Sequence, residues 1–296
     1  MRLARSDPRN CIYCDEVTEK LSDEHIVPYS LGGTLILENA SCASCADTTS
    51  RFEGSVARGE LHCVRSQLKI KTRRKKARRS EIGIRVWLGK FGPVVDRFVP
   101  VDTAPICAIA KTYTPIDSDS DGRFGCDSRI GYRGFILDES IPDQVVGPLG
   151  GRFRRRHDLL VRKHGAYKIE YMSDPSIVAN PAFERLLWKV VHCLGEAYFP
   201  RSIASTQSRD IILGRSNPVS NNGGALLVSG ISSVLIPPQP AANNGVKLTT
   251  EFGAGGRIIV EIRILRQIGF PVYCISIPNF EDSPLNIDLP FSSQPN

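Results

Sequence analysis

The chain has 296 residues, 41% hydrophobic and 23% charged, which excludes a wholly disordered or fibrous protein. No apolar run approaches the roughly 20 residues that span a bilayer, and the first residues lack the apolar core of a signal peptide, so we expect a cytoplasmic protein without a membrane partner. In such a reducing compartment the nine cysteines are expected to be thiols or metal ligands, and the net charge of +7 is compatible with a polyanionic partner.

Four of the cysteines form two C-x2-C pairs near the start of the chain: Cys11 with Cys14, and Cys42 with Cys45. Each pair can present two thiolates from one tight turn, and together they predict a tetrahedral zinc site. Four protein thiolates leave no open coordination position, so we expect this zinc to stabilise the fold without activating water. The alternatives are that one or both pairs are ordinary buried cysteines, or a redox C-x2-C pair, but two pairs flanking a short segment favour zinc.

The segment between the pairs carries a second pattern. It reads Ser22-Asp23-Glu24-His25-Ile26-Val27-Pro28, reaches Gly32-Gly33, and places Asn39 just before the second cysteine pair. With the two pairs, this segment resembles the HNH endonuclease family over roughly residues 10–61. The resemblance implies a ββα-metal module of two strands and a helix.

The resemblance also implies roles for three residues. His25 would be the general base that takes a proton from the attacking water, and Glu24 would bind a catalytic Mg²⁺ or Mn²⁺ ion, separate from the zinc. Asn39 would brace the loop that holds His25. These roles suit the side chains, because imidazole titrates near neutral pH and a carboxylate is a hard ligand for such ions. The implied activity is metal-dependent hydrolysis of DNA.

One position departs from the family pattern. The residue after the last cysteine of the second pair, normally a His or Asn that binds the catalytic ion, is Ala46. Asp47 is a candidate substitute ligand, although one step along a helix turns a side chain by about 100°. Ser50 and Glu53 fit a capping box at a helix start. The alternative function is therefore a catalytically impaired zinc module that binds nucleic acid or protein.

The charge changes sign after this module. Residues 10–61 hold nine acidic and three basic side chains, a balance that should repel DNA. A basic run without acidic residues follows, and it is either a solvated linker or the source of phosphate contacts. The residues of this run that we assign to nucleic-acid binding are Lys71, Arg73, Arg74, Lys75, Lys76, Arg78 and Arg79.

We divide the chain into an HNH module (1–64), a basic linker (65–80) and a larger strand-rich α+β domain (81–296) of unknown role, for which target recognition is one possibility. Apolar residues at helical spacing after Asn180-Pro181 predict a helix, with His192 on its polar, solvent-facing side. Alternation over residues 258–265 and the apolar run 272–277 predict a β-hairpin. Asp117 to Gly122 reads as a polar turn.

Overall fold

A computed structural model gives the fold of the chain. It describes residues 1–5, 8–59, 61–67, 70, 81–101, 103, 107–116, 125–136, 158–171, 181–198, 206–216, 230–234, 244–251, 257–265, 270, 272–278 and 286–290. Over these residues, no helix combines the length and the apolar character that crossing a membrane requires.

The N-terminal module is a small sheet followed by a long helix, as the sequence predicts. Strand β2 pairs antiparallel with β3, so that Glu24 lies opposite Leu37 and His25 opposite Ile36, and β1 adds a short parallel pairing on the other side of β3. The elements are β1 (Arg2–Leu3), β2 (Ser22–His25), the 3-10 helix η1 (Tyr29–Leu31), β3 (Ile36–Ser41), α1 (Ala43–Arg58) and α2 (His62–Gln67).

The turn that joins β2 to β3 explains the paired glycines. Gly32 ends η1 with φ of 89°, a left-handed conformation that glycine adopts without strain. Gly33 has no room for a side chain, because a Cβ atom there would lie 1.9 Å from the carbonyl oxygen of Val27. The turn is therefore closed tightly against the end of β2.

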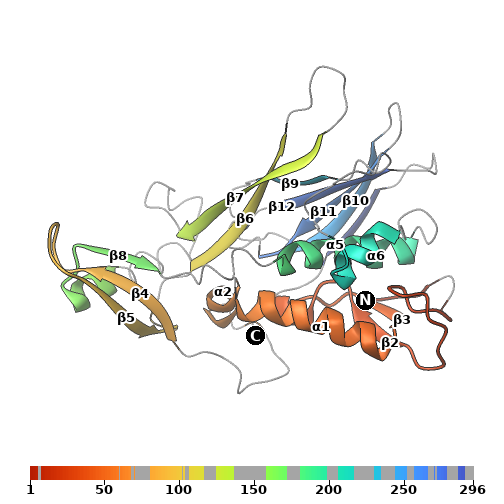
Figure 1. The fold of residues 1–296 in the computed structure, drawn as a ribbon, viewed down its shortest axis with the longest axis horizontal. Coiled ribbons are helices and arrows are strands. Elements are labelled where there is room, and N and C mark those ends of the chain that lie inside the picture. Colours follow the sequence, from red (N-terminus) through yellow and green to blue (C-terminus); the bar gives the residue numbers. More distant parts are fainter. Residues whose placement is uncertain are drawn as a thin grey trace.

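A five-stranded antiparallel sheet forms the largest described part of the C-terminal region, in the order β13-β10-β11-β12-β9 (Figure 1). The predicted hairpin is confirmed, since β11 pairs with β12 and Ile262 lies opposite Tyr273. The strands are β9 (Gly230–Val234), β10 (Gly245–Glu251), β11 (Arg257–Arg263), β12 (Val272–Pro278) and β13 (Asn286–Pro290).

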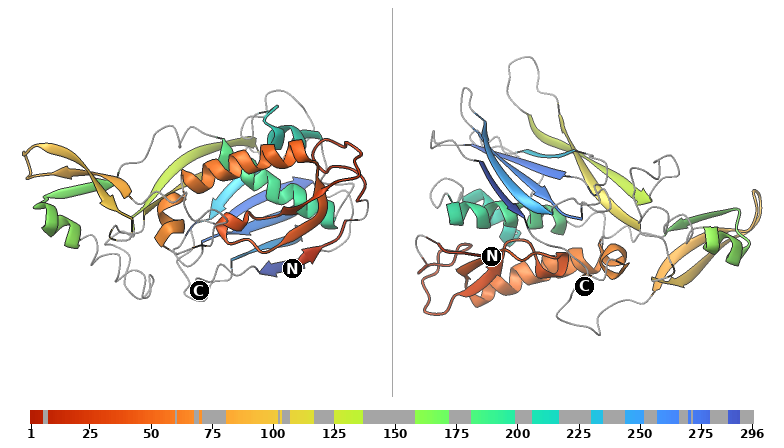
Figure 2. Two further views of the ribbon diagram at one scale, coloured as in Figure 1. Left: turned by 90° about the horizontal axis from the view of Figure 1, so that it is seen from below. Right: turned by 180° about the vertical axis from the view of Figure 1, so that it is seen from behind.

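Two helices, α5 (Ala182–Tyr198) and α6 (Thr206–Leu213), lie between this sheet and the N-terminal module (Figures 1 and 2). The helix predicted after Pro181 is confirmed by α5. Phe183 packs edge-on against Tyr273 of the sheet, with ring centroids 5.0 Å apart. One hydrophobic core runs from the sheet through α5 to Phe52 and Val56 of α1.

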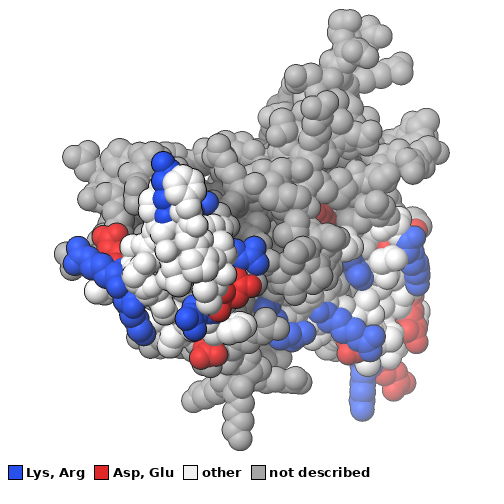
Figure 3. All heavy atoms as spheres, turned by 60° about the vertical axis from the view of Figure 1, so that its left-hand side comes forward, with Lys and Arg blue, Asp and Glu red and all other residues white. Residues whose placement is uncertain are grey.

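A smaller unit lies to one side of these layers. Strand β4 (Glu81–Trp87) pairs with β5 (Val94–Pro100) and β8 (Lys168–Tyr171), and a helical segment at 158–164 contributes Leu160 to its separate core. Figure 3 shows basic and acidic side chains interspersed on this unit. The remaining described strands, β6 (Cys107–Ile116) and β7 (Gly125–Ile136), form an antiparallel hairpin.

The division into domains at residues 65–80 stays a prediction. The described residues on either side of that segment share a hydrophobic core, which joins Phe52 of the module to α5 and the five-stranded sheet. The basic residues between 71 and 79, and the turn at 117–122, lie outside the described residues.

Candidate functional site

The four cysteines predicted to bind zinc come together. Their Sγ atoms all lie within 4.8 Å of one another, and those of Cys14 and Cys42 are 3.7 Å apart. A tetrahedral zinc ion with bonds of about 2.3 Å to sulfur requires sulfur atoms about 3.8 Å apart. The side chains therefore fit one zinc ion that is fully coordinated by protein.

Local backbone structure explains this convergence. Cys11 and Cys14 lie on a tight turn in which the amide of Asp15 donates to the carbonyl of Cys11 (3.0 Å), and Asp15 itself has φ of 60°. The amide of Ile12 donates to the carbonyl of Ala40 (2.9 Å), which fixes this turn against the end of β3. Cys42 is the N-cap of α1, so Cys45 lies on the first helical turn.

His25 ends strand β2 and is partly exposed. Its ring lies 5.7 Å from the ring of Tyr29, and its backbone carbonyl accepts a hydrogen bond of 2.6 Å from the Nζ atom of Lys189 on α5. A residue 164 positions away thus holds the backbone of the predicted general base.

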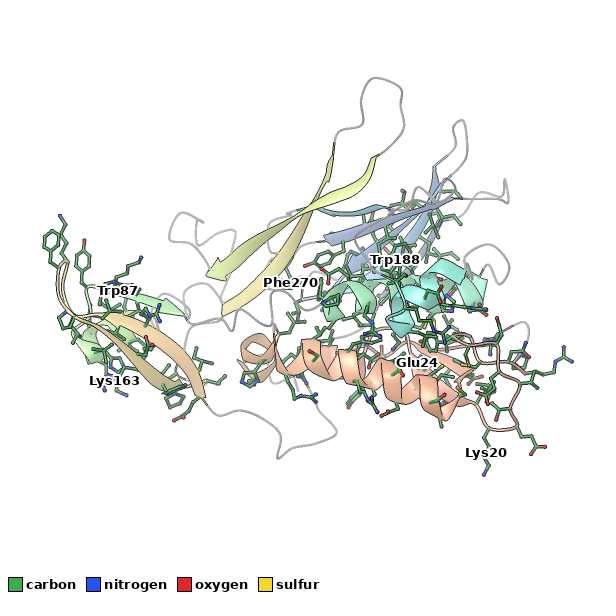
Figure 4. The ribbon with its side chains drawn as sticks, viewed as in Figure 1. Lys20, Glu24, Trp87, Lys163, Trp188 and Phe270 are labelled. Carbon is green, nitrogen blue, oxygen red and sulfur yellow. The ribbon has the colours of Figure 1, made fainter. Side chains whose placement is uncertain are left out.

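Glu24 is buried, and both of its carboxylate oxygens have partners. Oε1 lies 2.7 Å from Nζ of Lys189, and Oε2 accepts a hydrogen bond of 3.1 Å from the hydroxyl of Ser41. Figure 4 labels Glu24 where the N-terminal module faces α5, and Trp188 toward the sheet. Glu24, the expected ligand of the catalytic ion, is therefore already paired with the positive charge of Lys189.

Lys189 is fully buried and also forms an ion pair with Glu53 of α1. Burial by itself lowers the pKa of this ammonium group, but attraction to Glu24 and Glu53 outweighs that effect and raises the pKa above its ordinary value. The lysine is therefore charged at neutral pH, and it stands between two carboxylates from β2 and α1.

The four cysteines, the ββα order and His25 lie in one segment of the chain, and this segment can be compared with known families. Residues 11–54 match the HNH endonuclease family model. No curated protein and no solved structure matches the chain. The matched segment contains the four cysteines, the Glu24-His25 pair and Asn39, and we refer to residues 1–64, which include it, as the HNH module.

The polar face of α5 is buried against the HNH module, so the prediction that His192 faces solvent is wrong. Its Nε2 atom lies 2.8 Å from the carbonyl of Ile12 and its Nδ1 atom 3.0 Å from the hydroxyl of Ser208, while Tyr13 stacks on the ring. Burial lowers the pKa of His192 to about 4. The ring is thus a neutral contact to the zinc-binding turn.

Two further ion pairs attach the same turn to the helices. Arg5, 5% exposed at its side chain, lies 3.5 Å from Glu196 of α5, and Arg209 of α6 pairs with Asp15. Arg5 also donates to the carbonyls of Asn10 (2.7 Å) and Asn39 (2.8 Å). These pairs could not be predicted from the sequence alone, because their members lie far apart along the chain.

The remaining predicted positions lie on the surface or in the body of α1. Asn39 is exposed with φ of 48°, and its amide donates to Asp23 (3.2 Å). Asp47 is exposed and pairs with Arg51 on the next helical turn. The predicted capping box is wrong, because Ser50 and Glu53 lie in the middle of α1.

The first residue of the basic run has a structural role. Arg65 donates from its guanidinium to the carbonyls of Ser30 and Ala57, so it links α2 to η1 and to the end of α1. Its charge is thus used to hold backbone oxygens within the module.

The described residues do not fit a divalent cation at Glu24 as they are arranged. One carboxylate oxygen is paired with Lys189, the other accepts from Ser41, and Ala46 offers a methyl group where the family has a ligand. Within the described part of the chain, the cysteine quartet is the one cluster of at least three His, Cys, Asp or Glu side chains able to hold an ion.

Proposed function

We propose that the protein is an HNH-type endonuclease that hydrolyses phosphodiester bonds of DNA, with His25 as the general base. The observation that supports this most directly is the position of His25, which is partly exposed at the end of β2 inside the segment that matches the HNH family. An imidazole so placed can take a proton from a water molecule that attacks phosphorus.

The backbone around His25 is held in place, which favours this role. Lys189 binds its carbonyl oxygen, the antiparallel pairing with Ile36 fixes its strand, and the closed turn at Gly33 fixes the chain that follows. A general base contributes most when its distance to the attacking water varies little. The basic residues Lys71 to Arg79 are the proposed source of contacts to the DNA backbone.

The Mg²⁺ or Mn²⁺ ion that the family resemblance implies supplies, where it is bound, stabilisation of charge on the phosphate and leaving oxygen. Because Lys189 neutralises Glu24 in this chain, the proposed step assigned to protein residues is limited to proton transfer at His25 and to positioning of the DNA.

A second candidate function is a zinc-stabilised HNH module that binds nucleic acid without cleaving it. Two observations favour it: the ion pair between Glu24 and Lys189, and the methyl group of Ala46 at a ligand position. The ion pair occupies a carboxylate, and the methyl group replaces a ligand, with which the family binds its catalytic ion.

Nicking of supercoiled plasmid DNA distinguishes the two candidates. Wild type, H25A and A46N are assayed with Mg²⁺, with Mn²⁺ and with a chelator that leaves zinc bound. We expect wild type to nick DNA and H25A to lose about 10²- to 10⁴-fold in rate, the usual contribution of a general base. H164A, which changes a histidine in the β4-β5-β8 unit, is the matched control.

Two results would redirect the proposal. Equal nicking by H25A and wild type removes His25 from the chemistry. Nicking by A46N alone, with gel-shift binding of DNA by wild type, identifies the non-cleaving module. Zinc content is measured for each variant, since about one zinc ion per chain shows that the module is folded.

A further inference from the structure

The ammonium group of Lys189 is the positive charge that pairs with the carboxylate of Glu24, the residue expected to bind the catalytic ion. Its side chain is 0% exposed, it lies 2.7 Å from Oε1 of Glu24, and it also binds Glu53 and the carbonyl of His25. These three partners come from β2 and α1, the two elements that carry the family's catalytic positions. The lysine itself comes from α5, outside the matched segment.

Burial makes this charge indispensable to its partners. An ionised carboxylate without a counter-charge is very unfavourable away from water, so the buried Glu24 needs a cation nearby, and Glu53, 17% exposed at its side chain, shares the same cation. Lys189 satisfies that need without any ion from solution. Its position also sets a competition, because the ammonium lies 2.7 Å from Oε1 of Glu24 and repels any divalent cation that approaches the same oxygen.

We propose that Lys189 is a positioning residue of the HNH site, an internal counter-cation that fixes Glu24 and the His25 backbone and keeps divalent cations off Glu24. The catalytic part of this inference rests on the proposed nuclease function, whereas the exclusion of cations does not. The structure thereby assigns to α5 a part in determining the metal dependence of the HNH module.

A merely structural ion pair would predict a different result on substitution. If Lys189 only stabilised the packing of α5, its removal would lower stability whatever ions were present. If it also excludes cations, its removal leaves two carboxylates that a divalent cation can neutralise in its place. Affinity for Mn²⁺, and the effect of Mn²⁺ on stability, therefore separate the two roles.

The experiment uses the full-length, zinc-saturated protein and compares wild type, K189M, K189R and the surface control K90M. Binding of Mn²⁺ is measured by electron paramagnetic resonance and calorimetry, and thermal unfolding is followed over a Mn²⁺ titration. We expect K189M to bind Mn²⁺ about tenfold or more tightly than wild type and to gain stability as Mn²⁺ rises. K189R retains the charge and should behave like wild type.

A further substitution locates the site. Adding E24Q to K189M should abolish the gained Mn²⁺ affinity. Should K189M alone fail to fold without Mn²⁺, the double variant K189M/E53Q restores the original net charge of the cluster and is tested in the same way. Equal Mn²⁺ affinity in wild type and K189M overturns the inference, as does a K189M protein that stays unfolded at every Mn²⁺ concentration.

The binding measurement is independent of cleavage. Repeating it in the H25A background should give the same Mn²⁺ affinities, because Lys189 binds the backbone carbonyl of His25, which alanine retains. If H25A cleaves DNA like wild type, the proposed function fails while the role of Lys189 stands. If K189M gains no Mn²⁺ affinity but H25A abolishes cleavage, the role of Lys189 fails while the proposed function stands.

Discussion

Replacement of His192 by glutamine tests how the zinc-binding turn is attached to α5. In the folded chain the neutral ring donates from Nε2 to the carbonyl of Ile12 and accepts from Ser208 at Nδ1. Burial lowers its pKa from the ordinary 6.5 to about 4. Glutamine can donate to the same carbonyl but does not titrate.

The sign of the pH effect follows from linkage. Between pH 6.5 and 4 the unfolded chain binds a proton at His192 and the folded chain does not, so the free energy of unfolding falls as pH is lowered through this window. This difference between the unfolded and folded pKa corresponds to a loss on the order of 3 kcal/mol. Above pH 6.5 both states carry a neutral ring, and this contribution is fully present.

Urea unfolding at several pH values between 7.5 and 4 measures the effect. We expect the unfolding free energy of wild type to fall more steeply than that of H192Q, with the difference accumulating between pH 6.5 and 4. Zinc release on acidification affects both proteins, since both retain the four cysteines, and is followed in parallel. Identical pH profiles for the two proteins would refute the assignment of His192 as a buried neutral contact.

Two further substitutions test the HNH module itself. C42S removes one of the four thiolates at the start of α1, so bound zinc should fall from about one ion per chain toward none and the module should lose its cooperative thermal transition; full zinc retention would contradict the four-thiolate site. G33A places a Cβ atom 1.9 Å from the carbonyl oxygen of Val27, so the melting temperature should fall by several degrees, whereas an unchanged melting temperature would show that this turn is not closed as described.

The local features of the N-terminal module could be predicted from sequence because their causes are local. The spacing of the cysteines, the glycines of the turn and the order strand, strand, helix all act within about 50 residues, and the structure confirms the clustering of the four cysteines and the ββα order. The hairpin of β11 and β12 was likewise visible in alternating apolar residues.

The burial of the polar face of α5 could not be predicted in this way. The helix has one apolar face, and such a pattern ordinarily places the opposite face in water. Here both faces are covered, and Lys189, His192 and Glu196 find partners in the HNH module more than 100 residues earlier. A single sequence carries no sign of which distant carboxylate will meet which buried lysine.

The distance along the chain between Lys189 and its partners has a consequence for synthesis. The ribosome completes the HNH segment first, and the 164 residues between His25 and Lys189 take roughly 10–30 s to add at about 5–20 residues per second. During that interval Glu24 and Glu53 lack Lys189, and the turn of Cys11 and Cys14 lacks His192. A nascent chain therefore carries an HNH module without its contacts to Lys189 and His192 until α5 has left the exit tunnel.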